Sequence, residues 1–243
     1  MKEEVVPYEK LNLPKKEQVS LMFDRIAFRY DLMNRLLSFG IDTIWRKRML
    51  KMLYKRQPKR ILDVATGTAD VAIQLAALKP DKITGIDISA EMLHVGQLKL
   101  KEKKLDTLIS LQQADAENLP FTDNKFDAIT VAFGVRNFED LEKGLKELHR
   151  VLKKDGMLVV LEFSKPRITP FRQMFHFYFT YICPMLGEWI THDKMAYTYL
   201  HRSVAVFPDG KDFTDLLQKN GFESAQCTPL TFGISSIYTG IKH

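Results

Sequence analysis

The sequence predicts an α/β fold, with helices on both faces of a largely parallel sheet, and two features of the chain carry this prediction. Residues 61–70 read ILDVATGTAD, a short apolar run that enters a turn of small residues and then a helix. Strand-length apolar segments and helical spacings then alternate as far as residue 163. This alternation predicts ligand-binding groups at the carboxyl ends of the strands.

The turn after the first strand combines small residues with the start of a helix. Ala65, Gly67 and Ala69 let a ligand approach the backbone, and the amide groups at the helix start offer hydrogen-bond donors. This pattern favours a nucleotide-type cofactor pocket. A plain packing junction between strand and helix would look similar, because Ala69 stands where a third glycine is usual.

The first 57 residues are predicted to form an arm and a helical cap. Residues 1–14 are polar and interrupted by prolines, and apolar side chains at helical spacing run from near Glu17 to Tyr30. A turn with two aromatic residues is expected after Tyr30, and a second helix should end before Pro58. The basic residues of this second segment are typical of a solvated helix face: Arg46, Lys47, Arg48, Lys51, Lys55 and Arg56.

The rest of the chain supplies the sheet and its helices. Strands are predicted at residues 61–64, 82–87, 108–112, 126–133 and 157–163, and helices at residues 71–78, 90–104 and 141–152. A helix at residues 212–220 then precedes strands at residues 224–228 and 234–241. We expect these last two strands to form an antiparallel hairpin at the sheet edge.

Composition restricts the class of protein. The chain has 243 residues, 45% of them hydrophobic, so one large domain with additions can bury a sizeable core. Cys183 and Cys227 match no metal or disulfide spacing, which predicts a cytoplasmic protein without a metal site, and Cys183 is interpreted as a packing residue. No apolar segment reaches the ~20 residues of a membrane helix. The net charge of +6 suits an anionic membrane surface or nucleic acid, and solubility alone explains it equally well.

Carboxylates at the predicted strand ends are candidate cofactor ligands. Asp63 closes the first strand and Asp87 the second, where an acidic residue can accept hydrogen bonds from ribose hydroxyls. Asp87 alone does not separate a nicotinamide cofactor from S-adenosylmethionine. After the third strand, the Asp115 carboxylate can accept from an adenine amino group while the Ala116 amide donates to the ring. Helix capping is the alternative role for Asp115.

Four segments together resemble the quinone C-methyltransferases of ubiquinone and menaquinone biosynthesis (UbiE/MenG type): YDLMNRLLSFGIDTIW from Tyr30, ILDVATGTAD, FGVRN at 133–137 and EFSKP at 162–166. The resemblance implies a class I S-adenosylmethionine-dependent methyltransferase with a Rossmann-like domain at residues 58–243 and a seven-stranded mixed sheet. It also implies that the cofactor is bound at Thr68, Asp87, Asp115 and Ala116, with Asp63 and Gly67 in the same turn region.

The chain departs from that family at three places. Asp42 stands where the first signature usually has histidine, and Lys154-Asp155-Gly156 replaces the usual Pro-Gly-Gly. Ala132 stands where some members have a serine that contacts the cofactor. The first two departures lie outside the predicted cofactor turn, and Ala132 is not included in the predicted site.

Methyl transfer to carbon needs an electron-rich ring carbon held at near-attack distance from a sulfonium methyl group. A quinol carbon becomes electron-rich when the adjacent hydroxyl loses its proton. We expect Arg136 to stabilise the resulting phenolate and Asn137 to orient it, since arginine stays protonated. A salt bridge that closes the loop is the alternative role for Arg136. Asp31 is the candidate base by motif, with Tyr30 beside it as a ring or hydroxyl contact.

An aromatic insertion follows the fifth strand, at about residues 166–205. Its dense aromatic residues, interrupted by Pro184 and Gly187, predict a cap that lines a channel for a polyprenyl tail and touches the inner face of the plasma membrane. A cap without a lipid role, or a homodimer contact, is an equally weighted alternative. The resemblance suggests that Tyr197, Tyr199 and Ser203 face the substrate.

Three functions follow from the sequence. The first is S-adenosylmethionine-dependent C-methylation of a polyprenylated quinol, with demethylmenaquinol favoured; the second is methylation of another small molecule or RNA. The third, a nicotinamide enzyme, lacks a Gly-x-Gly-x-x-Gly turn. The RNA function lacks a catalytic motif and an added nucleic-acid module, so no nucleic-acid partner is expected.

Overall fold

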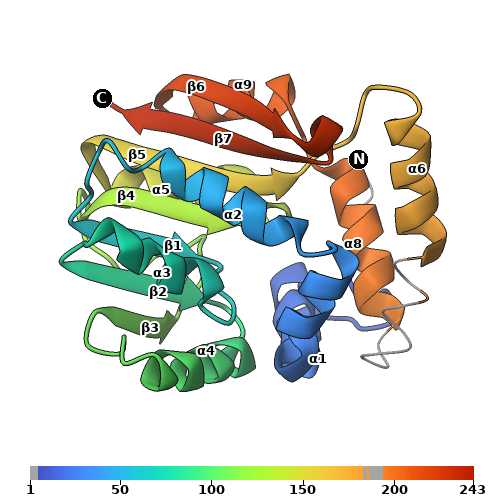
Figure 1. Cartoon of the computed structure of the whole chain (residues 1–243), viewed down its shortest axis with the longest axis horizontal. Helices are drawn as coiled ribbons and strands as arrows, with labels where there is room; N and C mark the ends of the chain where they lie inside the picture. Colours follow the sequence, from blue (N-terminus) through green and yellow to red (C-terminus); the bar gives the residue numbers. More distant parts are fainter. Residues whose placement is uncertain (1–4, 183–184, 186–193) are drawn as a thin grey trace.

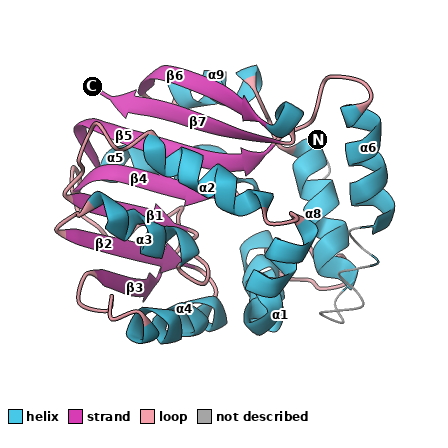
Figure 2. Ribbon diagram, viewed as in Figure 1, coloured by secondary structure: helices cyan, strands magenta, loops and turns pink. Residues whose placement is uncertain are grey.

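The computed structural model describes residues 5–182, 185 and 194–243, and its centre is a seven-stranded mixed sheet (Figures 1 and 2). The strand order is β3-β2-β1-β4-β5-β7-β6, and only β7 runs against its neighbours. The strands are β1 (Arg60–Val64), β2 (Lys82–Asp87), β3 (Ile109–Gln113), β4 (Phe126–Ala132), β5 (Leu152–Phe163), β6 (Phe222–Leu230) and β7 (Ser235–Lys242). The predicted mixed sheet is confirmed. Strands β1 and β4 are neighbours at its centre, so their carboxyl ends lie side by side.

Helices cover both faces of this sheet, with α2 and α3 on one face and α5 and α9 on the other (Figure 2). The described helices are α1 (Lys15–Leu37), α2 (Ile41–Lys51), α3 (Asp70–Leu75), α4 (Ala90–Glu102), α5 (Leu141–Val151), α6 (Phe171–Phe177), α8 (Lys194–Val206) and α9 (Lys211–Lys219). Short helical turns include η2 (Val135–Asn137), η3 (Tyr178–Ile182) and η4 (Thr231–Gly233).

Strand β1 explains why its sequence is apolar without alternation. Ile61 packs into the core on the side of α2 and α3, while Leu62 and Val64 pack into the core on the side of α5 and α9. All three side chains are fully buried. A strand with helices on both faces needs apolar residues at consecutive positions, and each such side chain contributes about 1.5–3 kcal/mol by its burial.

The N-terminal cap lies across the carboxyl ends of the strands. Val19, Met22 and Ile26 of α1 pack with Met92 of α4 and Tyr199 of α8. Helix α1 therefore contacts both the sheet domain, through α4, and the segment that follows β5, through α8. The N-terminal helix and this later segment thus lie side by side although they are far apart in the sequence (Figure 1).

Helix α1 is longer than the sequence predicts, because it continues through Tyr30 to Leu37. The residues after Tyr30 contain no glycine or proline, and the turn falls instead at Phe39 and Gly40, which have φ of 51° and 74°. Helix α2 ends at Lys51, earlier than Pro58, and turns follow it.

Strand β5 begins at Leu152, five residues before the predicted start at Met157. Leu152 pairs with Phe126 of β4, and the register shifts before Met157 pairs with Ala128. Asp155 has a φ of 61° within this irregular stretch. A bulge thus includes residues 153–156 in the strand, although their sequence is typical of a loop.

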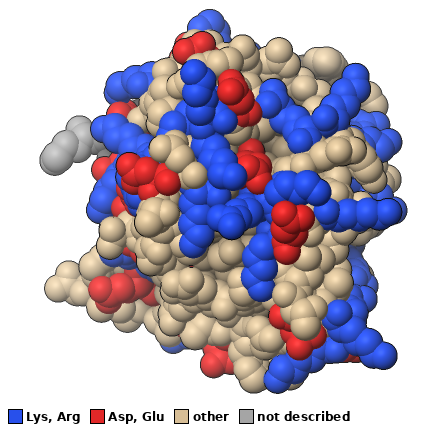
Figure 3. All heavy atoms as spheres, turned by 90° about the vertical axis from the view of Figure 1, so that its left-hand side faces the viewer, with Lys and Arg blue, Asp and Glu red and all other residues tan. Residues whose placement is uncertain are grey.

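The opposite end of the sheet, where β1, β4 and β5 begin, carries many charges (Figure 3). Lys and Arg side chains gather on this face with Asp and Glu among them. Lys153 of β5, for example, pairs with Asp127 of β4 at 2.6 Å. Interspersed charges of this kind are typical of a solvated surface. Within the described part of the chain, no helix is both long and apolar enough to cross a membrane.

Candidate functional site

Three adjoining cavities lie at the carboxyl ends of the strands, and Tyr30 of α1 lines all of them. The acidic cavity, about 80 Å³, contains Asp87, Asp115 and Ala116 in its wall. The turn cavity, about 30 Å³, lies between the β1–α3 turn and Arg46. The aromatic cavity, about 330 Å³, lies between the cap helices and the ends of β4 and β5. Tyr30 therefore marks the junction of the three spaces.

Asp87 is held in the acidic cavity by backbone donors. One carboxylate oxygen accepts from the Gly67 amide at 2.8 Å and the other from the Ser89 amide at 2.9 Å. Each oxygen keeps acceptor capacity for a further donor, such as a ribose hydroxyl. Gly67 has a φ of +54°, which brings its amide toward Asp87. Burial raises the pKa of Asp87, and the amide hydrogen bonds oppose that shift.

Asp115 follows β3 and lines the same cavity. It accepts from the Glu117 amide at 2.8 Å, and Lys16 of α1 lies 3.3 Å from its other oxygen. The chain turns here without starting a helix, so the helix-capping alternative is wrong. The Lys16 contact raises the pKa of that lysine. The start of α1 thus lies over the acidic cavity.

Asp63 lines the turn cavity from inside the sheet. It is fully buried and accepts hydroxyl hydrogen bonds from Thr66 and Thr130, both at 2.6 Å. Burial raises the pKa of Asp63 to about 6, although both hydroxyl groups favour its charged form. Asp63 therefore holds the β1 turn against β4.

Thr68 and Asp31 lie together in an ion-pair network below the turn. The Thr68 hydroxyl donates to Asp31 at 2.6 Å, and Lys99 of α4 lies 2.8 Å from Asp31 and 3.1 Å from Thr68. Lys99 also pairs with Asp70. Asp31 lines none of the three cavities. Sequence analysis missed Lys99, because its partners come from two elements distant in the chain.

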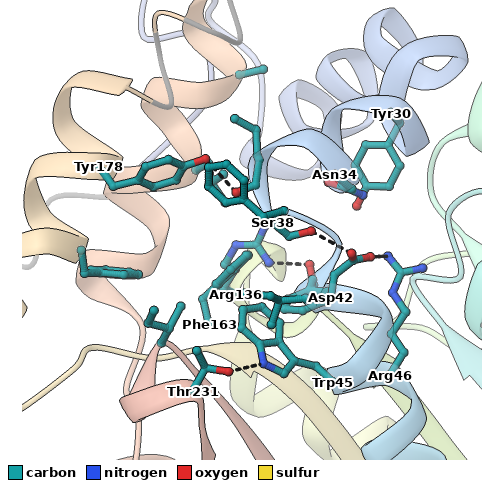
Figure 4. Close-up of a pocket in the computed structure, with 18 of the residues that line it drawn as sticks. Tyr30, Asn34, Ser38, Asp42, Trp45, Arg46, Arg136, Phe163, Tyr178 and Thr231 are labelled. Carbon is teal, nitrogen blue, oxygen red and sulfur yellow. Dashed lines mark hydrogen bonds and ion pairs between the residues drawn. The ribbon is translucent and has the colours of Figure 1, made fainter. Parts of the chain in front are cut away.

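Three aromatic rings cluster in the wall of the aromatic cavity, and Figure 4 labels two of them, Trp45 and Phe163. Phe133 and Phe163 lie 4.7 Å apart between centroids, and Trp45 lies 6.2 Å from Phe133 and 6.3 Å from Phe163. The Trp45 indole donates to the Thr231 hydroxyl at 2.8 Å. Phe171, Met174 and Phe175 of α6, with Tyr178 and Leu200, line the cavity from the segment after β5. A flat apolar ring fits between such walls.

Arg136 lies in the wall of the aromatic cavity, and 7% of its side chain is exposed. Its guanidinium group contacts Glu162 at 2.8 Å, donates to the Phe133 carbonyl and lies 5.5 Å from the centre of the Phe163 ring. The Nε donor has no partner among the described residues. Arg136 thus forms the salt bridge that the alternative role predicts, with Glu162, and it also lines the aromatic cavity.

Burial raises the pKa of Glu162, and the charge of Arg136 opposes that rise. Glu162 is completely buried at the end of β5. The sequence shows this residue in EFSKP but does not reveal that it holds Arg136, which lies 26 residues earlier.

Asn137, next to Arg136, lines the acidic cavity and accepts from the Tyr199 hydroxyl at 3.2 Å. Tyr199 also lines the aromatic cavity, whereas the Ser203 hydroxyl donates to the Leu200 carbonyl. The predictions for the side chain of Tyr197 and for Cys183, Pro184 and residues 186–190 lie outside the described residues.

Helix α2 brings two charged side chains, Asp42 and Arg46, to the wall of the aromatic cavity. Arg46 is buried, so the prediction of a solvated face is wrong for this residue, while Lys47 and Lys51 are exposed. Arg46 pairs with Asp70 at 2.9 Å and lies 3.4 Å from Asp42, which has Ser38 as its second partner (Figure 4). Arg46 therefore differs from Lys47 and Lys51 on the same helix, because its side chain is buried against α3 and the cap.

The acidic and turn cavities fit S-adenosylmethionine. Asp87 offers acceptors to ribose hydroxyls, and Asp115 and Ala116 offer an acceptor and an amide beside it. Gly134 comes so close to the turn that an added Cβ would lie 2.5 Å from the Cβ of Ala65, so a larger residue there would displace the turn that lines both cavities. When bound, this cofactor supplies a methyl group on a positively charged sulfur.

Fold and site together define a class I S-adenosylmethionine-dependent methyltransferase. In fold, the chain is similar to such an enzyme from Thermotoga maritima, a possible histamine N-methyltransferase, with a TM-score of 0.63 at 20% identity over 92% of this chain and 99% of the other. A putative S-adenosylmethionine-dependent methyltransferase from Methanococcus maripaludis gives a TM-score of 0.61 at 17% identity, covering 97% and 96%.

The chain belongs to the ubiE/COQ5 methyltransferase family, whose model matches residues 11–242. It is 45% identical to a demethylmenaquinone methyltransferase of Bacteroides fragilis, over 99% of this chain and 98% of the relative. It is 46% identical to the ubiquinone/menaquinone biosynthesis C-methyltransferase UbiE of Geotalea uraniireducens, over 94% and 97%. The predicted family, fold class and cofactor are confirmed.

Proposed function

We propose that the chain methylates a ring carbon of a polyprenylated naphthoquinol, demethylmenaquinol, to give menaquinol. The observation that carries this proposal is the aromatic cavity, which meets the cofactor cavities at Tyr30. Its apolar walls and ring cluster suit a fused aromatic ring with an apolar tail. Relatives of this chain are named for demethylmenaquinone methylation or for both quinones.

Arg136 and Asn137 lie on the two sides of the cavity junction, which supports their proposed roles. Arg136 presents a buried positive charge to the aromatic cavity, where the quinol oxygen would become negative. Such a charge acts strongly because water is excluded around it. Asn137 faces the cofactor side and is oriented by Tyr199. Tyr30 lines both cavities, so its ring would border the donor and the acceptor.

A direct test incubates the protein with radiolabelled S-adenosylmethionine and one of three acceptors. A reduced naphthoquinol with a prenyl tail should take up label faster than the matching benzoquinol. Ribosomal RNA should take up none. Label in RNA, or in neither lipid, would contradict the proposal and favour the second function.

The cap offers a surface that supports peripheral contact with the bilayer in which a polyprenyl quinol resides. Large apolar side chains are exposed on the cap helices and the turn between them, among them Phe28 (73%), Phe39 (79%), Met174 (62%) and Phe177 (57%). Met174 also lines the aromatic cavity. Exposed aromatic residues beside a tail-binding cavity are typical of interfacial docking.

Co-sedimentation with vesicles of anionic and neutral phospholipid tests this contact. The wild type should pellet with vesicles, and a Phe39→Ser/Phe177→Ser variant should bind at least several-fold more weakly, because two large apolar groups no longer enter the interface. Leu98→Ser is a matched control, since Leu98 is 51% exposed on α4. Equal binding by both variants would exclude the cap as the docking surface.

A further inference from the structure

The aromatic cavity has a single carboxylate in its described wall, that of Asp42 in the first turn of α2. This side chain is buried, with 6% of the residue exposed. The motif-based candidate, Asp31, lines none of the three cavities described above and is engaged by Lys99 and Thr68. A base for the substrate hydroxyl must reach that hydroxyl directly or through one water. Position therefore favours Asp42 over Asp31.

Both oxygens of Asp42 have a partner and retain capacity for another. Ser38 donates to one oxygen at 2.7 Å, and the Arg46 guanidinium lies 3.4 Å from the other. A carboxylate has about four lone-pair sites, so each oxygen can accept one further hydrogen bond. Figure 4 shows Asp42 between Ser38 and Arg46, in the group of side chains that surround the cavity.

Arg46 does not depend on Asp42 for charge compensation, because it also pairs with Asp70 at 2.9 Å. The charged or titratable groups that line the cavity with Asp42 are Tyr30 from α1, Arg46 from α2 and Arg136 from η2, together with the phenols of Tyr178 and Tyr199. Asp42 thus shares the cavity wall with Arg46 and Arg136, and the Nε donor of Arg136 has no partner among the described residues.

We propose that Asp42 accepts the proton of the quinol hydroxyl next to the methylated carbon, an inference that rests on the function proposed above. The O–H bond breaks and its proton moves to Asp42, which leaves a phenolate beside Arg136. The ring carbon forms its bond to the methyl group as the carbon–sulfur bond of the donor breaks. That carbon then loses its hydrogen to water as a proton, and Asp42 returns its own proton to the oxygen, so one proton is released overall.

A binding measurement tests the contact without cofactor. 1-Naphthol can donate a hydrogen bond to Asp42, whereas 1-methoxynaphthalene cannot, and Trp45 in the cavity wall reports binding by its fluorescence. The wild type should bind the naphthol about 10-fold more tightly, the lower range for a hydrogen bond to a charged group. Asp42→Asn should reduce that preference several-fold. Equal binding of both probes by the wild type would overturn the proposal, even if the variant fails to fold.

Kinetics test the proton transfer itself. Asp42→Asn should lower kcat at least about 10²-fold with unchanged S-adenosylhomocysteine affinity, the usual effect of losing a general base. Asp42→His should recover most of that rate and give kcat/KM a new acid limb near the ordinary histidine pKa of about 6.5. Asp127→Asn is the matched control, because it removes a carboxylate that pairs with Lys153 at the opposite end of the sheet and leaves the cavity carboxylate in place.

Three outcomes would overturn the proposal: wild-type turnover in Asp42→Asn, an equal kcat loss in Asp127→Asn, or an Asp42→His enzyme with the pH profile of the wild type. Failure of the proposed function is a separate result, since it appears as a wild-type protein that methylates no quinol at all.

Discussion

Replacing Arg136 by alanine should destabilise the fold as well as slow the reaction, because this guanidinium is the partner of a completely buried carboxylate. Glu162 has no exposed side-chain surface and lies 2.8 Å from Arg136. Removing one member of a buried pair typically costs about 3–5 kcal/mol in the free energy of unfolding. For a chain of this length that corresponds to a fall in Tm of roughly 6–20 °C.

The loss should depend on pH in a definite direction. Burial raises the pKa of Glu162 above its unfolded value, and without Arg136 that pKa rises further. The folded variant then binds a proton more strongly than the unfolded chain, so its stability falls as pH increases above about 4.5. Melting curves should therefore separate the variant from the wild type more at pH 8 than at pH 6.

A double variant separates stability from catalysis. Arg136→Ala/Glu162→Gln removes the buried charge, so most of the lost stability should return in urea unfolding followed by circular dichroism. Turnover should stay roughly 10²-fold below the wild type, with cofactor affinity nearly unchanged, because the charge that we propose to stabilise the phenolate is still missing. A single variant as stable as the wild type at pH 8, or a double variant with normal turnover, would refute this reasoning.

Three further predictions concern the cofactor side. Burial raises the pKa of Asp63 to about 6, so the contribution of Asp63 to the free energy of unfolding should fall by up to ~3 kcal/mol as pH rises from about 4 through 6. Asp63→Asn should make the free energy of unfolding, measured by urea titration, less dependent on pH in this range. Asp87→Ala should weaken cofactor binding at least about 10-fold by calorimetry while quinol-analogue binding is retained; equal cofactor affinity would contradict the role of Asp87. In Gly134→Ala the new Cβ would lie 2.5 Å from Ala65, so we expect a loss of about 1–3 kcal/mol and weaker cofactor binding; an unchanged Tm would show that the turn can shift freely.

The sequence predicts the sheet well because its strands are short apolar segments separated by helices and turns. Strand β2 has the predicted bounds, Lys82–Asp87. The misplaced boundaries are those that depend on other elements. Leu152 joins β5 because Phe126 of β4 is there to pair with it, and α1 continues past Tyr30 because α4 and α8 pack along it.

The site is predictable where it follows from topology. Parallel strands end at one edge, so Asp63, Asp87 and Asp115 meet there, as their positions after successive strands indicate. The groups that hold them are set by tertiary contacts. Lys99 reaches Asp31 across 68 residues of chain, and nothing in the local pattern of α4 indicates that contact.

The reversed direction of β7 has a practical consequence. Ser235, at its start, pairs with Phe163 beside the aromatic cavity, and the strand then runs to the far end of the sheet, where the chain terminates (Figure 1). An affinity handle attached after His243 would point away from the cap and the aromatic cavity. Protein captured on a sensor chip by that handle would therefore present its cap to injected vesicles.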